Sequence, residues 1–237
     1  MYIWKCWRDS RGAFLVFLIL ICVWGLAGTA ILANIGGWTS RRATPVIWYE
    51  FAHILIATQV VFAFFSAFAL GASTLGDDHA KGALPFLLTR PRSRASMCWQ
   101  SWLVGAVALE ILVLIALGWF RFTPGFARFP RHPDSPVYSD RALLMILITL
   151  FLYSLTFFFT LLLKNGRYGA GMVLLLVIAY MTVGILLTVS FDFGLPYVPG
   201  PRPRAFQGPL WPEISIWLSA SFLLATGSQL VFARQEV

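Results

Sequence analysis

A block of charged residues between two long apolar runs carries the side chains best suited to bind another molecule. Residues 71–96 read GASTLGDDHAKGALPFLLTRPRSRAS. The charges surround a short apolar core, Leu84–Leu88, which lies between Gly82 and Pro91. Apolar anchors with a charged rim are typical of a helix that docks into a groove. The expected contact residues are Asp77, Asp78, His79, Lys81, Gly82, Leu84, Phe86, Leu87, Leu88, Arg90, Arg92 and Arg94.

Residues 71–96, called the docking block below, have the local signals of a short helix. Asp77 or Asp78 can cap a helix N-terminus, Pro85 is tolerated in a first turn, and Pro91 ends a helix. Such a helix would present Phe86, Leu87 and Leu88 to a partner. The alternative is a basic interfacial loop that binds anionic lipid headgroups.

Three ionisable residues lie in the apolar runs on either side of this block. Glu110 falls near the middle of the run that follows it, where a charge is costly and usually faces a partner or a water-filled cavity. It is either a pathway or gating residue or a paired packing contact. Glu50 and His53, one turn apart where the preceding run begins, form either an interfacial pair or a relay.

Composition indicates a membrane protein. Of the 237 residues, 59% are hydrophobic and only 12% are charged, about half the charged fraction of a soluble domain. Because a bilayer core needs about 20 apolar residues per helix, we expect one all-α membrane domain over 1–237 with six transmembrane helices. The expected spans are 13–34, 50–72, 97–119, 142–163, 169–190 and 213–233.

The chain lacks the common catalytic and nucleotide-binding motifs. It contains no G-x-x-x-x-G-K-[ST], no H-E-x-x-H and no G-x-S-x-G. The three cysteines show no paired spacing, and the three histidines lie in different segments. The net charge of +8 comes from basic residues between apolar runs, which argues against nucleic-acid binding. We therefore expect no enzyme activity, cofactor or metal in this chain.

The first eleven residues form an amphipathic start. Ile3, Trp4 and Trp7 lie on one side of a predicted helix and the charged residues on the other, a pattern typical of an interfacial helix. A signal peptide is the alternative. Residues 12–40 contain no charge, which is longer than a signal h-region, so an uncleaved interfacial helix over 1–11 is preferred.

Small residues in the second span predict a close helix contact. Ala63, Ala67 and Gly71 repeat at i, i+4 and i+8. Such a ridge lets another helix approach closely, either within the chain or in a second subunit. Six spans place both termini on one side, but ten of the 18 basic residues inside against eight outside give only a weak positive-inside bias.

The run Lys81–Arg94, KGALPFLLTRPRSR, follows the second expected span and resembles the signature loop of ABC-2 type transporter permeases. The family pattern is K-G-T-L-E-F-L-L-[ST]-x-P-[VI]-S-R, with Ala83 and Pro85 here at its Thr and Glu positions. The start at 4–11 resembles the family's elbow helix, and the Pro-rich segment 191–212 its outer re-entrant hairpin. The matching residues are Gly82, Leu84, Phe86, Leu87, Leu88, Pro91, Ser93 and Arg94.

The resemblance implies the permease subunit of an ABC exporter for a hydrophobic or amphipathic substrate. Separate ATPase subunits would bind ATP and Mg and would contact the coupling helix between the second and third spans. The family also implies a second permease chain and a prokaryotic inner membrane with both termini cytoplasmic. The alternative is a membrane sensor or assembly scaffold whose basic loop binds lipid or protein.

Overall fold

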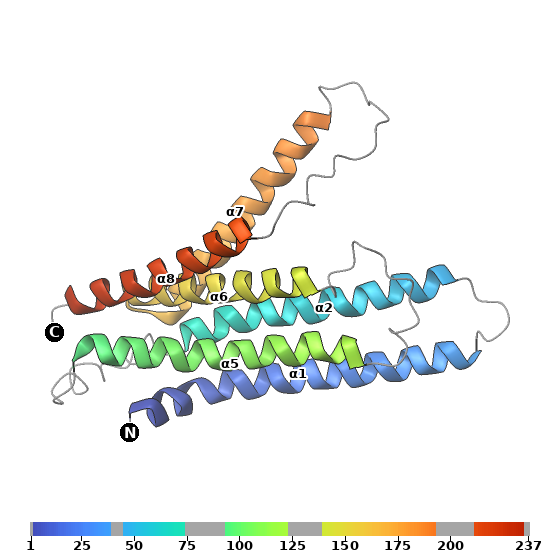
Figure 1. Ribbon diagram of the computed structural model, residues 1–237, viewed down its shortest axis with the longest axis horizontal. Helices are drawn as coiled ribbons and strands as arrows, with labels where there is room; N and C mark the ends of the chain where they lie inside the picture. The colour runs from blue at the N-terminus through green and yellow to red at the C-terminus, as the bar shows by residue number, and fades with distance from the viewer. Residues whose placement is uncertain (1, 39–44, 74–92, 123–138, 193–210, 235–237) are drawn as a thin grey trace.

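The computed structural model describes residues 2–38, 45–73, 93–122, 139–192 and 211–234, and its regular structure there is entirely helical (Figure 1). The all-α prediction is confirmed. The helices are α1 (Tyr2–Trp38), α2 (Pro45–Ala72), α5 (Arg94–Phe122), α6 (Ser139–Leu162), α7 (Gly166–Asp192) and α8 (Trp211–Arg234). Each expected span lies within one of these helices, except for Leu163, one residue beyond α6.

Four of the helices are long and apolar enough to cross a membrane. Their qualifying stretches are Ile3–Ile31, Ala95–Trp119, Met145–Leu162 and Ile214–Arg234. Helices α2 and α7 contain shorter apolar stretches within the described residues, Thr58–Ala72 and Gly166–Thr182. Large apolar side chains such as Leu175 and Tyr180 are well exposed on the outside of the bundle. An apolar exterior of this kind is expected for a protein that lies in lipid.

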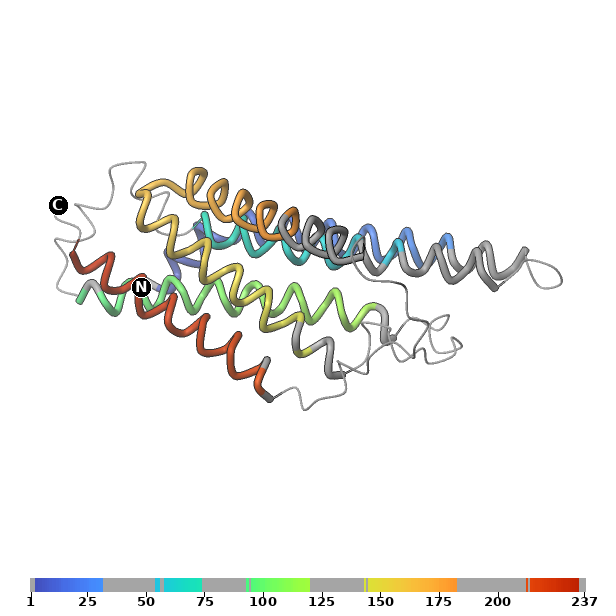
Figure 2. The backbone as a smooth tube through the Cα atoms, turned by 90° about the horizontal axis from the view of Figure 1, so that it is seen from above, coloured from blue at the N-terminus to red at the C-terminus, as the bar shows by residue number. Residues whose placement is uncertain are grey.

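Helix α6 lies at the centre of the bundle. It packs against α2, α5, α7 and α8, whereas α1 packs against α2 and α5. The start of α1 and the end of α8 lie at the same end of the bundle (Figure 1), and the view from above agrees (Figure 2). The end of α2 and the start of α5 lie at that end as well, so the segment between them begins and ends beside both termini.

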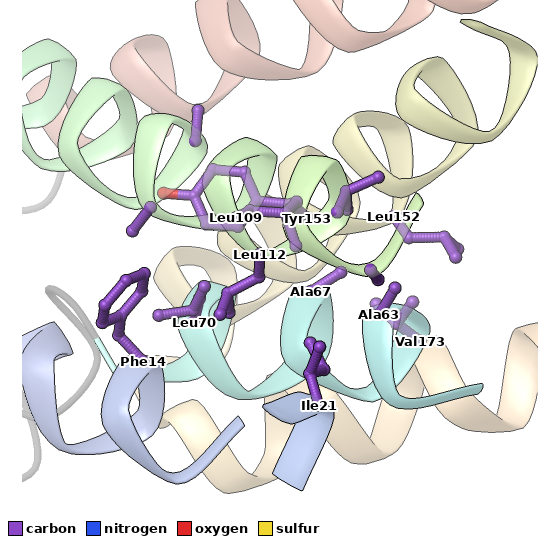
Figure 3. Packing of buried hydrophobic residues seen from close by; sticks show 14 residues of the cluster. Phe14, Ile21, Ala63, Ala67, Leu70, Leu109, Leu112, Leu152, Tyr153 and Val173 are labelled. Carbon is purple, nitrogen blue, oxygen red and sulfur yellow. The ribbon is translucent and has the colours of Figure 1, made fainter. Parts of the chain in front are cut away.

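Two buried clusters hold the helices together. The larger one combines residues of α1, α2, α5, α6 and α7 (Figure 3). The smaller one joins α1, α5, α6 and α8 through Cys6, Met97, Cys98, Phe157, Leu161 and Phe232. The first cluster therefore covers the middle of the bundle, and the second ties the start of α5 to the two terminal helices.

The amphipathic N-terminal segment is continuous with the first long helix. Ile3 and Trp4 are exposed, while Trp7 packs edge-on against Phe14 with ring centroids 5.3 Å apart. The buried face follows Cys6, Ser10 and Phe14 instead. The hydroxyl of Ser10 donates a hydrogen bond to the Cys6 carbonyl at 2.9 Å, which satisfies this polar group within the helix.

Local capping sets the boundaries of the helices at the terminal end. The backbone N–H of Ser96 donates to the hydroxyl oxygen of Ser93 at 3.3 Å, so Ser93 caps α5. Lys164, with φ of 54°, ends α6 in the left-handed region that terminates many helices. The backbone N–H of Arg167 donates to Asn165 Oδ1 at 2.9 Å and starts α7. These caps confine the α6–α7 connection to a tight turn.

Glycine lets α7 approach α6 closely. A Cβ atom at Gly169 would lie 2.6 Å from the backbone N and Cα of Thr160. By contrast, a Cβ atom at Gly171, on the same helix, would meet nothing within 4 Å. The two glycines therefore differ in their surroundings although they are two residues apart.

We predict that Gly169→Ala lowers bundle stability by about 1–3 kcal/mol, because the added methyl group meets backbone atoms that cannot rotate away. The matched control, Gly171→Ala, should leave stability within about 1 kcal/mol or raise it through helix propensity. Thermal unfolding of the purified proteins in detergent micelles measures both. Equal melting temperatures for the two variants would contradict the close α6–α7 contact.

Candidate functional site

The docking block connects two helices whose ends are described. Its first residues belong to the end of α2, where the backbone N–H of Ser73 donates to the Ala69 carbonyl at 3.0 Å. Its last residues lead into α5 from Ser93. Arg94 is the first residue of α5. Residues 74–92, which include the other predicted contact residues Asp77 to Arg92, lie outside the described residues.

The end of α2 is held against the start of α7. A Cβ atom at Gly166 would overlap the carbonyl oxygen of Ala72, so the two helix ends touch through backbone atoms. Further along α2, a Cβ atom at Gly71 would lie 2.8 Å from Cβ of Thr156 on α6. A displacement of Ser73 would therefore be transmitted directly to α6 and α7, because close-packed interiors transmit strain.

The small-residue ridge of α2 makes its contacts within the chain. Ala63 and Ala67 are buried in the large cluster (Figure 3), and Gly71 meets Thr156 and the Tyr153 carbonyl. The structure thus places the ridge against helices of the same chain. This observation favours the intrachain alternative over a subunit interface for these three positions.

The start of α5 is tied to α6 by two polar contacts. Trp102 Nε1 donates to Ser154 Oγ at 3.1 Å, and the Tyr153 hydroxyl donates to the Trp102 carbonyl at 2.9 Å. Tyr153 is fully buried and packs where Gly105 leaves room for its ring. Sequence analysis missed this group, although a Tyr-Ser pair inside an apolar span is a signal for interhelical hydrogen bonding.

Aromatic contacts extend the anchor of α5 to α8. Trp99 lies edge-on to Trp102, with centroids 5.5 Å apart, and packs against Phe222 of α8 at 5.9 Å. Met97 and Cys98 belong to the cluster that includes Cys6 of α1 and Phe232 of α8. The first two turns of α5 therefore contact α1, α6 and α8 together.

Glu110 lies at a seam between the buried and the exposed face of α5. It follows the buried Leu109 and precedes Val113 by one turn, while Val107 and Leu114 beside it are exposed. Both carboxyl oxygens are buried and have no hydrogen-bond partner among the described residues. The other charged side chains that the structure describes lie in the first ten residues of α1, at the α6–α7 turn and the start of α7, or at the end of α8, whereas Glu110 lies in the middle of its helix.

The other predicted ionisable residues of the spans give no geometry. Glu50 and His53 lie in α2, but their side chains are outside the described set. Within the described residues, no group of three or more His, Cys, Asp or Glu side chains could hold a metal ion. The candidate site is thus the pair of anchored helix ends beside the docking block, with Glu110 deeper in the bundle.

A scan against family models finds no matching family, and a search of curated proteins finds no match.

We predict that Glu110→Leu raises the stability of the bundle by about 1–3 kcal/mol, because it removes a buried polar group that lacks a hydrogen-bond partner. The matched control is Leu109→Ala on the adjacent buried position, which should lower stability by about 2–5 kcal/mol. Thermal unfolding in micelles measures both. A lower melting temperature for Glu110→Leu would mean that the carboxyl group has a stabilising partner.

Proposed function

We propose that this chain is the transmembrane permease subunit of an ATP-binding cassette transporter. The observation that carries the proposal is the run Lys81–Arg94, whose pattern resembles the coupling loop of ABC-2 permeases and which leads into α5. The helical bundle supports it, since the loop begins and ends at the same end of the bundle as both termini. In the proposed arrangement all six helices cross the membrane and both termini are cytoplasmic.

The proposed mechanism uses the two anchored helix ends. Partner ATPase subunits bind and hydrolyse ATP with Mg, and their closure moves the loop over residues 77–94. The end of α2 passes this movement to α6 through Gly71, which packs against the Thr156 side chain, and to α7 through the backbone contact between Ala72 and Gly166. The start of α5 passes it to α1, α6 and α8 through the Trp102 and Cys98 contacts. The helices that contact α2 and those that contact α5 then tilt together.

The proposed transport direction is export across a prokaryotic inner membrane. A path opens between this chain and a second permease chain, and the substrate is hydrophobic or amphipathic. The aromatic side chains of α2, such as Phe65 and Phe68, suit an apolar substrate. The first turns of α1, with Ile3 and Trp4 exposed, fit the elbow helix of the proposed family at the membrane interface.

Co-purification tests the proposal. Tagged wild-type chain should bring down an ATPase subunit that contains a P-loop motif. Leu87→Glu should weaken that association about thirtyfold, because it places a charge on an apolar anchor of the interface. The matched control, Leu163→Glu, changes an exposed leucine beside the α6–α7 turn and should leave the association intact. If no P-loop ATPase is recovered, the chain acts instead as a sensor or scaffold.

The role of Glu110 is tested in the assembled transporter. Glu110→Gln should change transport-coupled ATP turnover about fivefold or more if the carboxylate lines the pathway, since loss of about 1 kcal/mol changes a rate by that factor. Leu114→Gln, one turn away on an exposed position, is the control and should leave turnover close to wild type. Unchanged turnover and transport in Glu110→Gln would assign Glu110 to packing.

A further inference from the structure

An apolar groove runs between α1, α2 and α7 at the terminal end of the bundle. Its volume is about 460 Å³, within the range of ligand pockets. Phe17 of α1, Phe65 and Phe68 of α2 and Leu174 of α7 form its walls. Its floor consists of small residues, since the close contact between Gly166 and Ala72 holds α2 and α7 together there. The groove is not enclosed and opens to the outside of the bundle.

One cation lies at the mouth of this groove. Arg167 lines it from the first turn of α7 and is exposed. No carboxylate of the described residues forms an ion pair with Arg167; the described ion pairs join Asp9 to Lys5 and Arg8. Ser73, also at the mouth, donates its hydroxyl hydrogen to the Leu70 carbonyl at 3.2 Å. The guanidinium group of Arg167 is therefore available to pair with an anion at the groove.

We propose that the groove binds an anionic glycerophospholipid of the surrounding leaflet. One acyl chain lies between Phe17 and the Phe65–Phe68 pair, and the phosphate group pairs with Arg167. Helix α7 begins at Gly166, at the end of the bundle that carries the termini, so Arg167 lies where headgroups are found when the helices cross a bilayer. A single cation at the end of an apolar groove matches the two parts of a lipid in charge and in polarity.

Judged by the described residues, a second copy of the chain fits the groove less well in charge. Among the side chains that the structure describes, the carboxylates of such a copy are Asp9, which already pairs with two cations, and Glu110, which lies near the middle of α5. Neither can reach Arg167 without breaking ion pairs or moving across the membrane. Lipid phosphates are present at that depth around every copy, so the lipid satisfies Arg167 at no such cost.

The lipid would also act on the helix end that leads to the docking block. Its chain would contact both helices that meet at the Ala72–Gly166 contact, through Phe65 and Phe68 of α2 and Leu174 of α7. A bound lipid thus stabilises the packing of α7 on α2. This inference rests on the proposed arrangement in which α2 and α7 cross the membrane, but it does not depend on transport or on ATPase partners.

Photo-crosslinking tests the proposal with the full chain in nanodiscs. The probes are phosphatidylglycerol and phosphatidylcholine with the same diazirine-bearing acyl chain, and adducts are mapped by peptide mass spectrometry. We expect adducts concentrated on residues 65–73 and 166–174, about fivefold more with phosphatidylglycerol, the preference expected from one basic residue near the surface. Adducts spread evenly over the exposed faces of α1, α5 and α8 would overturn the proposal.

Paired variants separate the headgroup contact from the chain contact. Arg167→Gln should lower phosphatidylglycerol adducts to the phosphatidylcholine level, and Arg167→Lys should keep most of the preference; Arg11→Gln, which removes another exposed cation, is the control. Gly171→Leu should remove the adducts of both probes, because Gly171 lines the groove and a Cβ atom there would meet nothing within 4 Å, so the larger side chain can occupy the groove. Its control is Gly118→Leu, another open position.

Two results would contradict the lipid assignment. Wild-type levels of phosphatidylglycerol adducts in Arg167→Gln would show that Arg167 does not hold the headgroup. Disulfide-linked dimers of Ala170→Cys in native membranes, together with absence of groove adducts, would show that a second copy covers the groove. Circular dichroism and gel filtration confirm that each variant folds. If Gly171→Leu fails to fold, the comparison of Arg167→Gln with Arg167→Lys still decides the outcome.

Discussion

The bundle depends on close contact between α6 and the glycines of its neighbours. In lipid, apolar side chains gain little by leaving one apolar environment for another, so helix association relies on tight packing and interhelical hydrogen bonds. Tyr153, Thr156 and Thr160, successive turns of α6, each meet a glycine of a different helix. These glycines are Gly105 of α5, Gly71 of α2 and Gly169 of α7. Helix α6 is therefore central because a glycine on each of three partner helices makes room for one of its side chains or for its backbone.

Many polar groups inside the bundle follow the same logic, although Gln59 Oε1, Thr160 Oγ1, Gln229 Nε2 and both Glu110 oxygens are buried without a hydrogen-bond partner among the described residues. Tyr153 and Trp102 satisfy their donors across the α5–α6 contact, and Gln59 of α2 donates to the Ile21 carbonyl of α1 at 3.0 Å. Each bond links two helices where side-chain packing alone would be weak. Glu110 departs from this arrangement, since both its oxygens are buried without a partner among the described residues. Expensive polar positions of this kind in membranes commonly mark functional sites.

Close helix contacts connect both ends of the docking block to the rest of the bundle. The two helices that it joins both contact α6, and each also has a further contact at the terminal end: α2 touches α7 through Gly166, whereas α5 touches α1 and α8 through Cys98 and Trp99. A force on one short loop therefore reaches every helix of the bundle within one contact. The lipid groove lies along the first of these routes, beside the Ala72–Gly166 contact, so lipid and loop act on the same helix pair.

The positions of the described helices along the chain follow from the sequence alone. Apolar length predicted each helix of the described residues to within a few residues, except where the N-terminal segment proved continuous with the first span, and a charged residue inside a span singled out Glu110. The sequence did not determine which faces are buried. Phe65 is 48% exposed and Phe157 is fully buried, yet both stand in predominantly apolar runs without charged residues. Because lipid and protein interior are both apolar, no hydrophobic periodicity separates them. Only the tertiary structure decided which glycines touch α6 and that Arg167 ends an apolar groove, since both depend on which helices become neighbours.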